Sequence, residues 1–376
     1  MLLPFKHGKV INGSYFVNRK RDIAYLQNNF SSKINTIIIS PRRWGKSSLV
    51  MEASRDLAKK NKKIKFVYLD MFNIRNEAEF YEVFTQKILK ASYTNWEERI
   101  KKSKLFFKHL LPKFSFGLDP QTEFSVSFNW DDVIKTPSEI LNLPETISKE
   151  KNIEIVVCLD EFQNIAHFRK PVEFQKKLRA HWQHHQVATY CLYGSKRHMM
   201  TEIFEHKAMP FYKFGDVFFL QKISTQHWVK YIIKKFTKSQ KIITPKNAET
   251  FIKLVENHSY FVQQLGNIVW MNTEKETTEA IIEQSITQLI SQYDMLFQKE
   301  LDNLTNHQVN FLKALVNKEP QLSNKNTIRK YRLGTSGNVN RVKQALISKE
   351  VIDIYNRKIE FLDPLFKLWF QRVYMK

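Results

Sequence analysis

The chain has 376 residues and a mass near 44.9 kDa, enough for two or three domains at roughly 150 residues each. Hydrophobic residues make up 43% and charged residues 26%, which excludes a disordered or collagen-like chain. The 60 lysines and arginines exceed the 37 aspartates and glutamates, so the formal charge is +23 and a polyanionic partner is favoured. Because 45 of these cations are lysines, which also serve solubility, charge alone leaves contact with nucleic acid open.

The sequence carries no pattern for insertion into a membrane or for export. No run of 18 apolar residues occurs, and the first residues lack a secretory signal. Cys158 and Cys191 both lie inside apolar runs. We therefore expect a cytoplasmic protein without a membrane partner, in which both thiols are buried and reduced.

Five short runs of β-branched and aromatic residues predict the strands of one sheet. They span residues 35–39, 65–69, 155–159, 189–193 and 217–220. Continuous apolar strands that alternate with helical patterns are typical of a parallel sheet with helices on both faces. The fold class predicted for this part is α/β, doubly wound.

Residues 114–128 break that pattern and predict a β-hairpin. Apolar and polar residues alternate on either side of a Gly-Leu-Asp-Pro turn, so one face gathers aromatic and aliphatic side chains. They are Phe114, Phe116, Phe124, Val126 and Phe128. We interpret residues 112–130 as an insertion into the sheet domain, with packing favoured over docking as its role.

Helical spacing replaces the strands from about residue 224. Residues 225–240, 245–272 and 274–304 predict helices, and the last 72 residues predict three helices followed by a short β-hairpin. Three helices and a two-stranded wing describe a winged helix-turn-helix. The predicted domains are therefore an α/β sheet domain over 1–223, a helical domain over 224–304 and a winged helix over 305–376.

The most informative stretch is Ser40-Pro-Arg-Arg-Trp-Gly-Lys-Ser-Ser48, which follows an isoleucine-rich strand and precedes a helix. This is the layout of a P-loop, in which backbone N–H groups at a helix start surround phosphate oxygens. Lys46 would reach the β- and γ-phosphates of ATP, and the Ser47 hydroxyl would ligate Mg²⁺. The expected nucleotide-binding residues of the loop are Arg43, Trp44, Gly45, Lys46, Ser47 and Ser48.

A second motif ends a buried strand with two carboxylates, Asp160 and Glu161. Ligands of parallel sheets collect at the carboxyl ends of the strands, where Asp160 would hold Mg²⁺ and Glu161 would polarise an attacking water. Ser195 follows a neighbouring strand and would contact the γ-phosphate or that water. Lys46, Glu161 and Ser195 are the predicted catalytic residues, against the alternative of acids that merely cap a surface strand.

With these residues, the chain resembles the prokaryotic P-loop ATPases of the archaeal-type ATPase group, within the STAND and AAA-like class. The motifs that carry the resemblance span nearly the whole chain. They are Phe16-Val-Asn-Arg-Lys-Arg-Asp-Ile-Ala-Tyr-Leu26, Pro41-Arg-Arg-Trp-Gly-Lys-Ser-Ser-Leu49, Leu159-Asp-Glu-Phe-Gln163, Gly194-Ser195 and Leu362-Asp-Pro-Leu-Phe-Lys-Leu-Trp-Phe370. The resemblance implies a P-loop NTPase sheet, a helical lid and a C-terminal winged helix. It also implies adenine held near Phe16 and Val17, with Arg19 nearby.

Two positions depart from the family pattern. Ser40 replaces the first glycine of the P-loop, and Phe214 stands where family members commonly carry an arginine. Nucleotide binding is still expected, but assistance to hydrolysis at position 214 is not. The arginines left as candidates for that assistance are Arg42, Arg43, Arg169, Arg179 and Arg197.

Residues 321–349 carry seven cations and no acid, a distribution that favours contact with DNA or RNA phosphates. Asn338, Asn340, Arg341 and Gln344 on the second predicted helix could read base edges. The expected nucleic-acid-binding residues are Arg329, Lys330, Arg332, Arg341, Lys343, Arg357 and Lys358.

Three functions remain open at this point. The first is a P-loop ATPase that hydrolyses ATP with Mg²⁺ and acts as a slow switch with a nucleic-acid-binding tail. The second is a DNA-binding winged-helix protein whose nucleotide site is regulatory or hydrolytically weak. The third is a scaffold that binds a protein through the 114–128 hairpin, and an oligomer or protein partner stays open in each case.

Overall fold

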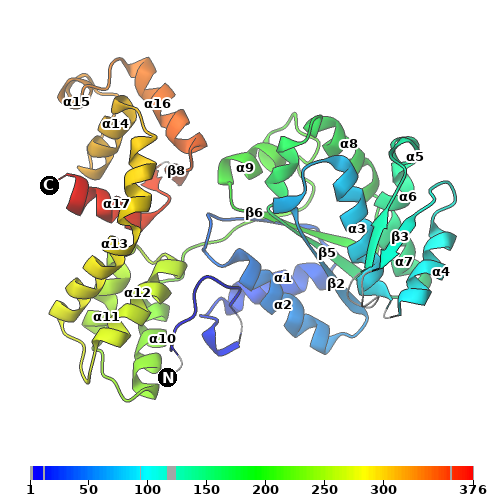
Figure 1. Cartoon of the computed structure of the whole chain (residues 1–376), viewed down its shortest axis with the longest axis horizontal. Coiled ribbons are helices and arrows are strands. Elements are labelled where there is room, and N and C mark those ends of the chain that lie inside the picture. The colour runs from blue at the N-terminus through cyan, green and yellow to red at the C-terminus, as the bar shows by residue number, and fades with distance from the viewer. Residues whose placement is uncertain (1–2, 12, 94, 117–123, 356–357, 376) are drawn as a thin grey trace. The chain divides into compact units, whose positions relative to one another are not determined.

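The protein is described by a computed structural model over residues 3–11, 13–93, 95–116, 124–355 and 358–375. The described chain forms two compact units (Figure 1). One is continuous and spans residues 19–221, and the other combines residues 1–18 with residues 222–376.

The continuous unit is built on a five-stranded parallel sheet in the order β2-β5-β6-β1-β7. Its strands are β1 (Thr36–Ile39), β2 (Ile64–Asp70), β5 (Glu154–Asp160), β6 (Thr189–Gly194) and β7 (Asp216–Phe219). All five predicted strands are present, and the sheet is parallel as expected. The register pairs Ile39 with Gly194 and Leu159 with Leu192, so β1, β5 and β6 end at one edge.

Helices cover both faces of this sheet (Figure 1). On one face Phe30 of α1 packs on Phe66 of β2, and Ser54 of α2 contacts Tyr68. The opposite face carries an aromatic core in which Trp182 stacks on Tyr190 with ring centroids 4.2 Å apart. The helices of the unit are α1 (Lys20–Ser31), α2 (Lys46–Lys60), α3 (Glu77–Ser92), α4 (Trp96–Phe106), α5 (Trp130–Lys135), α6 (Pro137–Leu141), α7 (Leu143–Lys151), α8 (Pro171–Trp182) and α9 (Arg197–Glu205), with 3-10 turns at Met71–Asn73 and Phe162–His167.

The predicted hairpin forms as β3 (Lys113–Phe116) and β4 (Phe124–Ser127), which are antiparallel. Phe114 lies opposite Val126 in the register, as the alternation of apolar residues predicts. Val126 is buried, and Phe114 and Phe128 are half-buried against the core of the unit. The described part of the hairpin therefore packs on its own domain, while its turn at 117–123 lies outside the described residues.

The second unit begins with a short 3-10 turn and a helical bundle. Its elements are Gly13–Tyr15, α10 (Thr225–Lys238), α11 (Pro245–Leu254), α12 (Ser259–Asn272) and α13 (Glu279–Asp302). The single helical stretch expected over 245–272 is two helices, because Glu256 and Asn257 adopt left-handed φ angles of 49° and 59°. Phe5 is buried among these helices, and its backbone N–H donates to Asn267 Oδ1.

The same unit ends in the predicted winged helix. Its elements are α14 (Asn306–Val316), α15 (Lys325–Tyr331), α16 (Ser336–Ser348), β8 (Ile352–Tyr355), β9 (Lys358–Phe361), α17 (Pro364–Trp369) and a π-helical turn at Phe370–Tyr374. Strands β8 and β9 pair antiparallel as the wing. A capping box at Thr305 and Gln308 fixes the start of α14.

The helical bundle and the winged helix belong to one compact unit and share one apolar core. The described chain therefore divides into two compact units and not into three. The three-domain division at 223 and 304 stays a prediction. Among the described residues, no helix is both long enough and apolar enough to cross a bilayer. Cys158 and Cys191 are buried and not joined by a disulfide.

Candidate functional site: a P-loop opposite two carboxylates

The loop after β1 adopts a bend that depends on left-handed backbone angles. Arg43 has φ 63°, and Gly45, which precedes the first residue of α2, has φ 97°. A residue with a Cβ is strained at such an angle, so glycine suits position 45. The first backbone N–H groups of α2 follow this bend and, as at any helix start, have no acceptor within the helix. This is the anion-binding end of a 15-residue helix.

Ser40, at the position of the missing first glycine, fits the loop without strain. It does not adopt a positive φ and is fully buried. Its backbone N–H donates to the Gly194 carbonyl, which ties the start of the loop to the end of β6. The loop therefore forms with serine at this position, and the departure from the glycine pattern is local.

Arg19 holds the loop from outside the motif. Its guanidinium, with 5% of the side chain exposed, donates to the Trp44 carbonyl at 3.1 Å and to Asp22 Oδ2 at 3.0 Å. Burial lowers the pKa of Arg19, and Asp22 opposes that effect. The residue that the family resemblance places near adenine thus supports the carbonyl next to Gly45.

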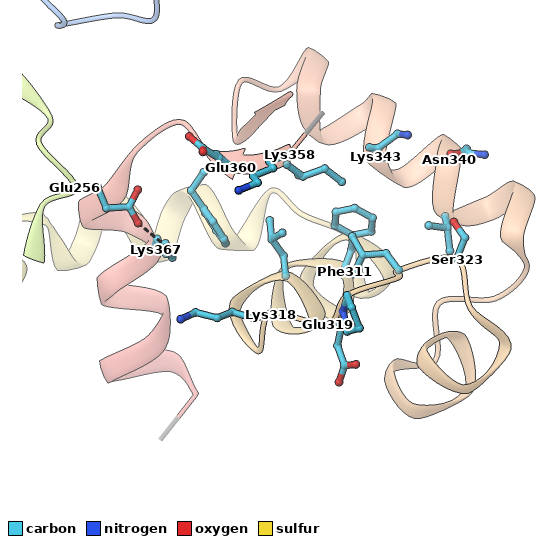
Figure 2. A pocket seen from close by; sticks show the side chains of 16 residues that line it. Glu256, Phe311, Lys318, Glu319, Ser323, Asn340, Lys343, Lys358, Glu360 and Lys367 are labelled. Atoms are coloured by element: carbon cyan, nitrogen blue, oxygen red, sulfur yellow. Dashed lines mark hydrogen bonds and ion pairs between the residues drawn. The ribbon is translucent and has the colours of Figure 1, made fainter. Parts of the chain in front are cut away.

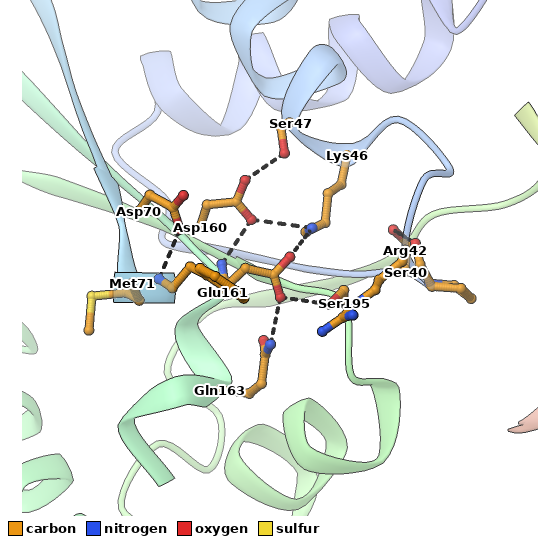
Figure 3. Close-up of polar contacts among 12 residues, drawn as sticks. Ser40, Arg42, Lys46, Ser47, Asp70, Met71, Asp160, Glu161, Gln163 and Ser195 are labelled. Carbon is orange, nitrogen blue, oxygen red and sulfur yellow. Dashed lines mark hydrogen bonds and ion pairs between the residues drawn. The ribbon is translucent and has the colours of Figure 1, made fainter. Parts of the chain in front are cut away.

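The two carboxylates after β5 face the first residues of α2 (Figure 3). Lys46 Nζ lies 2.5 Å from Glu161 Oε1 and 3.3 Å from Asp160 Oδ1. The Ser47 hydroxyl donates to Asp160 Oδ2 at 2.5 Å. The structure therefore brings together two predicted pairs, Lys46 with Ser47 and Asp160 with Glu161, which lie more than a hundred positions apart in sequence.

Glu161 is surrounded by donors. Oε2 accepts from the Ser195 hydroxyl and from Gln163 Nε2, both at 2.6 Å (Figure 3). Burial favours the protonated form, but Lys46 together with these donors outweighs it and holds the pKa of Glu161 below its ordinary value. At neutral pH the group is therefore a carboxylate held in a fixed position.

Asp160 has the opposite shift. Burial raises its pKa above the ordinary value, although Lys46 and the Ser47 hydroxyl act in the other direction. The groups that the protein supplies do not fully offset the cost of burying the charged Asp160 carboxylate, so this carboxylate favours a further cation nearby. Hydroxyl and carboxylate oxygens are the ligands that Mg²⁺ prefers, so the Ser47 and Asp160 pair fits that ion.

Three residues of the site were not predicted from the sequence. Gln163 is buried and bonds Glu161 directly. Asp70 ends β2 and pairs in register with Asp160, which adds a third carboxylate to this edge of the sheet. Gly194 leaves room for Gln163, because a Cβ there would collide with Gln163 Oε1 and Met200 Sδ. Gln163 and Gly194 lie within the motifs that carry the family resemblance, and Asp70 follows an apolar run as an acid at a strand end does, but none of the three was assigned a role.

Among the arginines left open by the sequence, Arg42 is at the site. Its Nε lies 3.4 Å from Ser195 Oγ. Phe214, in place of the family arginine, is buried in the aromatic core, and the Arg179 guanidinium lies 5.1 Å from the centre of its ring. Arg179 is thus engaged away from the carboxylates.

The other predicted nucleotide contacts are divided between the two units. Phe16 and Val17 belong to the other unit, and Val17 is buried in the core of that unit. Trp44 and Ser48 are buried within the loop and the start of α2, and Arg43 is exposed. The assignment of adenine to Phe16 and Val17 stays a prediction.

The basic residues of the winged helix divide by their contacts. Lys330 Nζ lies 2.7 Å from Glu319 Oε1, so its charge is already paired. Arg329, Arg332, Arg341 and Lys358 are exposed and Lys343 is half-buried, whereas Arg357 lies outside the described residues. Asn338, expected to read bases, instead donates to the Leu333 carbonyl and closes the turn before α16.

Comparisons with known proteins agree with this architecture. The family described as "Probable winged helix domain" matches residues 295–372, and no curated protein matches in sequence. A Walker-type ATPase of Pyrococcus abyssi has a similar structure, with a TM-score of 0.66 and 15% identity, over 97% of this chain and 99% of that one.

Two proteins of Aeropyrum pernix, ORC2 and ORC1, are also similar in structure. The ORC2 protein in its ADPNP–ADP complexes gives a TM-score of 0.54 with 13% identity, over 96% of both chains. The ORC1 protein in complex with DNA gives 0.50 with 8% identity, over 96% of this chain and 94% of that one. These likenesses show that the chain shares the fold of these proteins, a parallel α/β sheet that continues through a helical region into a winged helix.

Proposed function

We propose that this chain binds ATP with Mg²⁺ at the loop of residues 40–48 and hydrolyses it slowly, as a nucleotide-dependent switch. The observation that carries the proposal is the buried cluster in which Lys46 and Ser47 face Glu161 and Asp160 at 2.5 Å. A lysine and a hydroxyl at a helix start, opposite two carboxylates, are the parts that phosphoryl transfer to water requires.

Each side chain has one role in this proposal. The N–H groups at the start of α2 and the Lys46 ammonium bind the phosphate oxygens of ATP. Ser47 and Asp160 would hold Mg²⁺, which neutralises phosphate charge when bound. Glu161, oriented by Ser195 and Gln163, would accept a hydrogen bond from the attacking water and polarise it. Arg42, whose Nε lies 3.4 Å from Ser195 Oγ, would meet the negative charge of the phosphate.

Steady-state release of phosphate from Mg-ATP tests the proposal. Lys46→Ala should abolish ATP binding, and Glu161→Gln should bind ATP but lose turnover by roughly 10²-fold or more, because general-base assistance contributes at least that much. Glu173→Gln, an exposed glutamate on α8, is the matched control and should turn over as the wild type does. Unchanged ATP affinity in the lysine variant would refute the assignment of the site.

The winged helix supports a second activity, contact with nucleic acid. Asn340, Arg341 and Gln344 are exposed on α16, and the first turn of that helix contains no acid. Such side chains on the second helix of a helix-turn-helix are suited to base edges. If the full chain binds duplex DNA and releases no phosphate, the alternative of a DNA-binding protein with a silent nucleotide site is the better description.

A further inference from the structure

The winged helix contains a cavity of about 750 Å³ at the turn between α15 and α16. That volume falls within the range of about 300–1,000 Å³ typical of ligand sites. Its lining comes from the start of α14, from α15 and from the turn into α16. The lining residues are His307, Ser323, Lys325, Ile328, Arg329, Arg332, Gly334, Thr335 and Ser336.

The charged groups that line this cavity are all basic. Lys325, Arg329 and Arg332 contribute three cations and His307 contributes an imidazole, and among the residues that the structure describes no carboxylate lines the cavity. In the part of the chain that the structure describes, these three cations form no ion pair. By contrast, Lys330 on the same helix is paired with Glu319. Unpaired cations around one cavity favour an anionic ligand.

The backbone adds to the same preference. Thr335 caps α16 by accepting from the Asn338 N–H, while the preceding N–H groups of Ser336 and Gly337 have no helical acceptor. Gly334 adopts φ 84°, which turns the chain into the helix. The positive end of the α16 dipole thus lies at the cavity that the cations line.

A second cavity of the module provides an internal contrast. It has a volume of about 820 Å³ and lies between α14, α16 and β9 (Figure 2). Three carboxylates line it, Glu256, Glu319 and Glu360, besides four lysines. An anion in that cavity would meet like charge, so the two cavities differ in the ligand they suit.

We propose that the cavity at the α15–α16 turn binds phosphate groups of a nucleic-acid backbone and anchors α16 against the bases. This inference deepens, and rests on, the proposed contact with nucleic acid. Arg329 and Arg332 can each bind a phosphate with two parallel hydrogen bonds, which a lysine cannot do. The exposed face of α16 continues from the cavity through Asn340, Arg341 and Gln344, so an anchored backbone presents its bases to these side chains.

The test measures binding of a labelled duplex to the full chain across a salt series. One variant is a double variant that combines Arg329→Gln and Arg332→Gln. The other variant is His307→Gln alone. The matched control is Lys318→Gln, which removes an exposed lysine from the other cavity of the same module. We expect the arginine double variant to bind about 10-fold or more weakly and its salt slope to fall by about 1–2, because each lost phosphate contact removes about 0.9 from the slope.

The outcomes separate the inference from the function on which it rests. If the wild type does not bind duplex, the nucleic-acid function fails and the inference fails with it. If the wild type binds and the double variant matches Lys318→Gln in affinity and slope, the function stands and the anchor is wrong. A further experiment adds inorganic phosphate to the binding assay at constant ionic strength. If inorganic phosphate displaces the labelled duplex as strongly as the same concentration of phosphate groups in unlabelled duplex does, the cavity is a site for a free anion and the inference is wrong. Circular dichroism of each variant checks that the winged helix is folded.

Discussion

The Lys46 ammonium and the Glu161 carboxylate lie 2.5 Å apart, with only 10% and 16% of the two side chains exposed. A triphosphate must therefore draw the lysine away from a partner that is already well placed. Glu161→Gln removes this competition, and we expect it to bind Mg-ATP roughly 5-fold more tightly than the wild type, equivalent to about 1 kcal/mol. Titration of a fluorescent ATP analogue measures the change, and equal or weaker binding would contradict it. Asp160→Asn is the comparison, because loss of a Mg²⁺ ligand should weaken binding.

Arg19 supports the phosphate loop through the Trp44 carbonyl, so its loss should weaken binding of any triphosphate. We expect Arg19→Ala to reduce the affinity for ATP about 10-fold, since a buried carbonyl loses a charged donor. Arg21→Ala, an exposed arginine on the same helix, is the control and should bind as the wild type does. Inorganic tripolyphosphate distinguishes two roles. If its affinity is unchanged in Arg19→Ala while that for ATP falls, Arg19 acts on adenosine and not through the loop.

Gly194 makes room for the amide that orients Glu161. In Gly194→Ala the new methyl group would displace Gln163 or Met200, at a cost of about 1–3 kcal/mol in unfolding free energy. We expect turnover to fall with ATP affinity largely retained, because the new methyl group meets Gln163 and Met200 and the Gly194 carbonyl can still accept from the Ser40 N–H. Gly337→Ala in α16, where a Cβ would lie 3.8 Å from Thr335 Oγ1 and so make only an ordinary contact, should instead be neutral or slightly stabilising. Denaturation by urea and phosphate release on the same samples check both statements.

Glu145 makes the folded state sensitive to acid. Its buried carboxylate accepts from the backbone N–H groups of Gln186, Val187 and Ala188, just before β6. Burial alone would raise its pKa, but these bonds and Lys149 lower the pKa from 4.5 to about 2. The lower folded-state value means that the carboxylate stabilises the protein above pH 4.5 and that this stabilisation is lost as the pH falls toward 2.

Glu145→Gln should therefore be less stable than the wild type at pH 7 by on the order of 1–2 kcal/mol, after allowance for solvent screening. Between pH 4.5 and 2 the difference should shrink. Urea unfolding at pH 7, 4 and 3 measures it. Lys149→Ala is the companion variant, and we expect a smaller loss because the lysine is mostly exposed. A difference that is constant with pH would assign the effect to packing and not to the charge.

The sheet and the two principal motifs could be predicted from the sequence, because both depend on local patterns of residues. Apolar runs mark buried parallel strands, and acids at their ends mark the edge where ligands bind. The contacts of Arg19 and Gln163 could not be predicted, because each depends on how distant segments pack. The break between α11 and α12 was not predicted, because the left-handed backbone angles there belong to Glu256 and Asn257 and not to a glycine, which would have indicated the break. The bond from the Asn338 amide to the Leu333 carbonyl could not be predicted for a similar reason, since it closes a turn that only the fold defines.

Phe5 shows that the second unit is assembled from both ends of the chain. The side chain is 2% exposed, it rests on Gly266, and its backbone bonds Asn267. Cleavage between Gln221 and Lys222 would therefore not liberate two independent pieces, because the N-terminal segment would stay docked in the helical bundle. An expressed fragment that starts at residue 222 would lack the Phe5 side chain and would expose the apolar residues against which Phe5 packs. Any attempt to study the winged-helix half alone should fuse residues 3–18 back onto it.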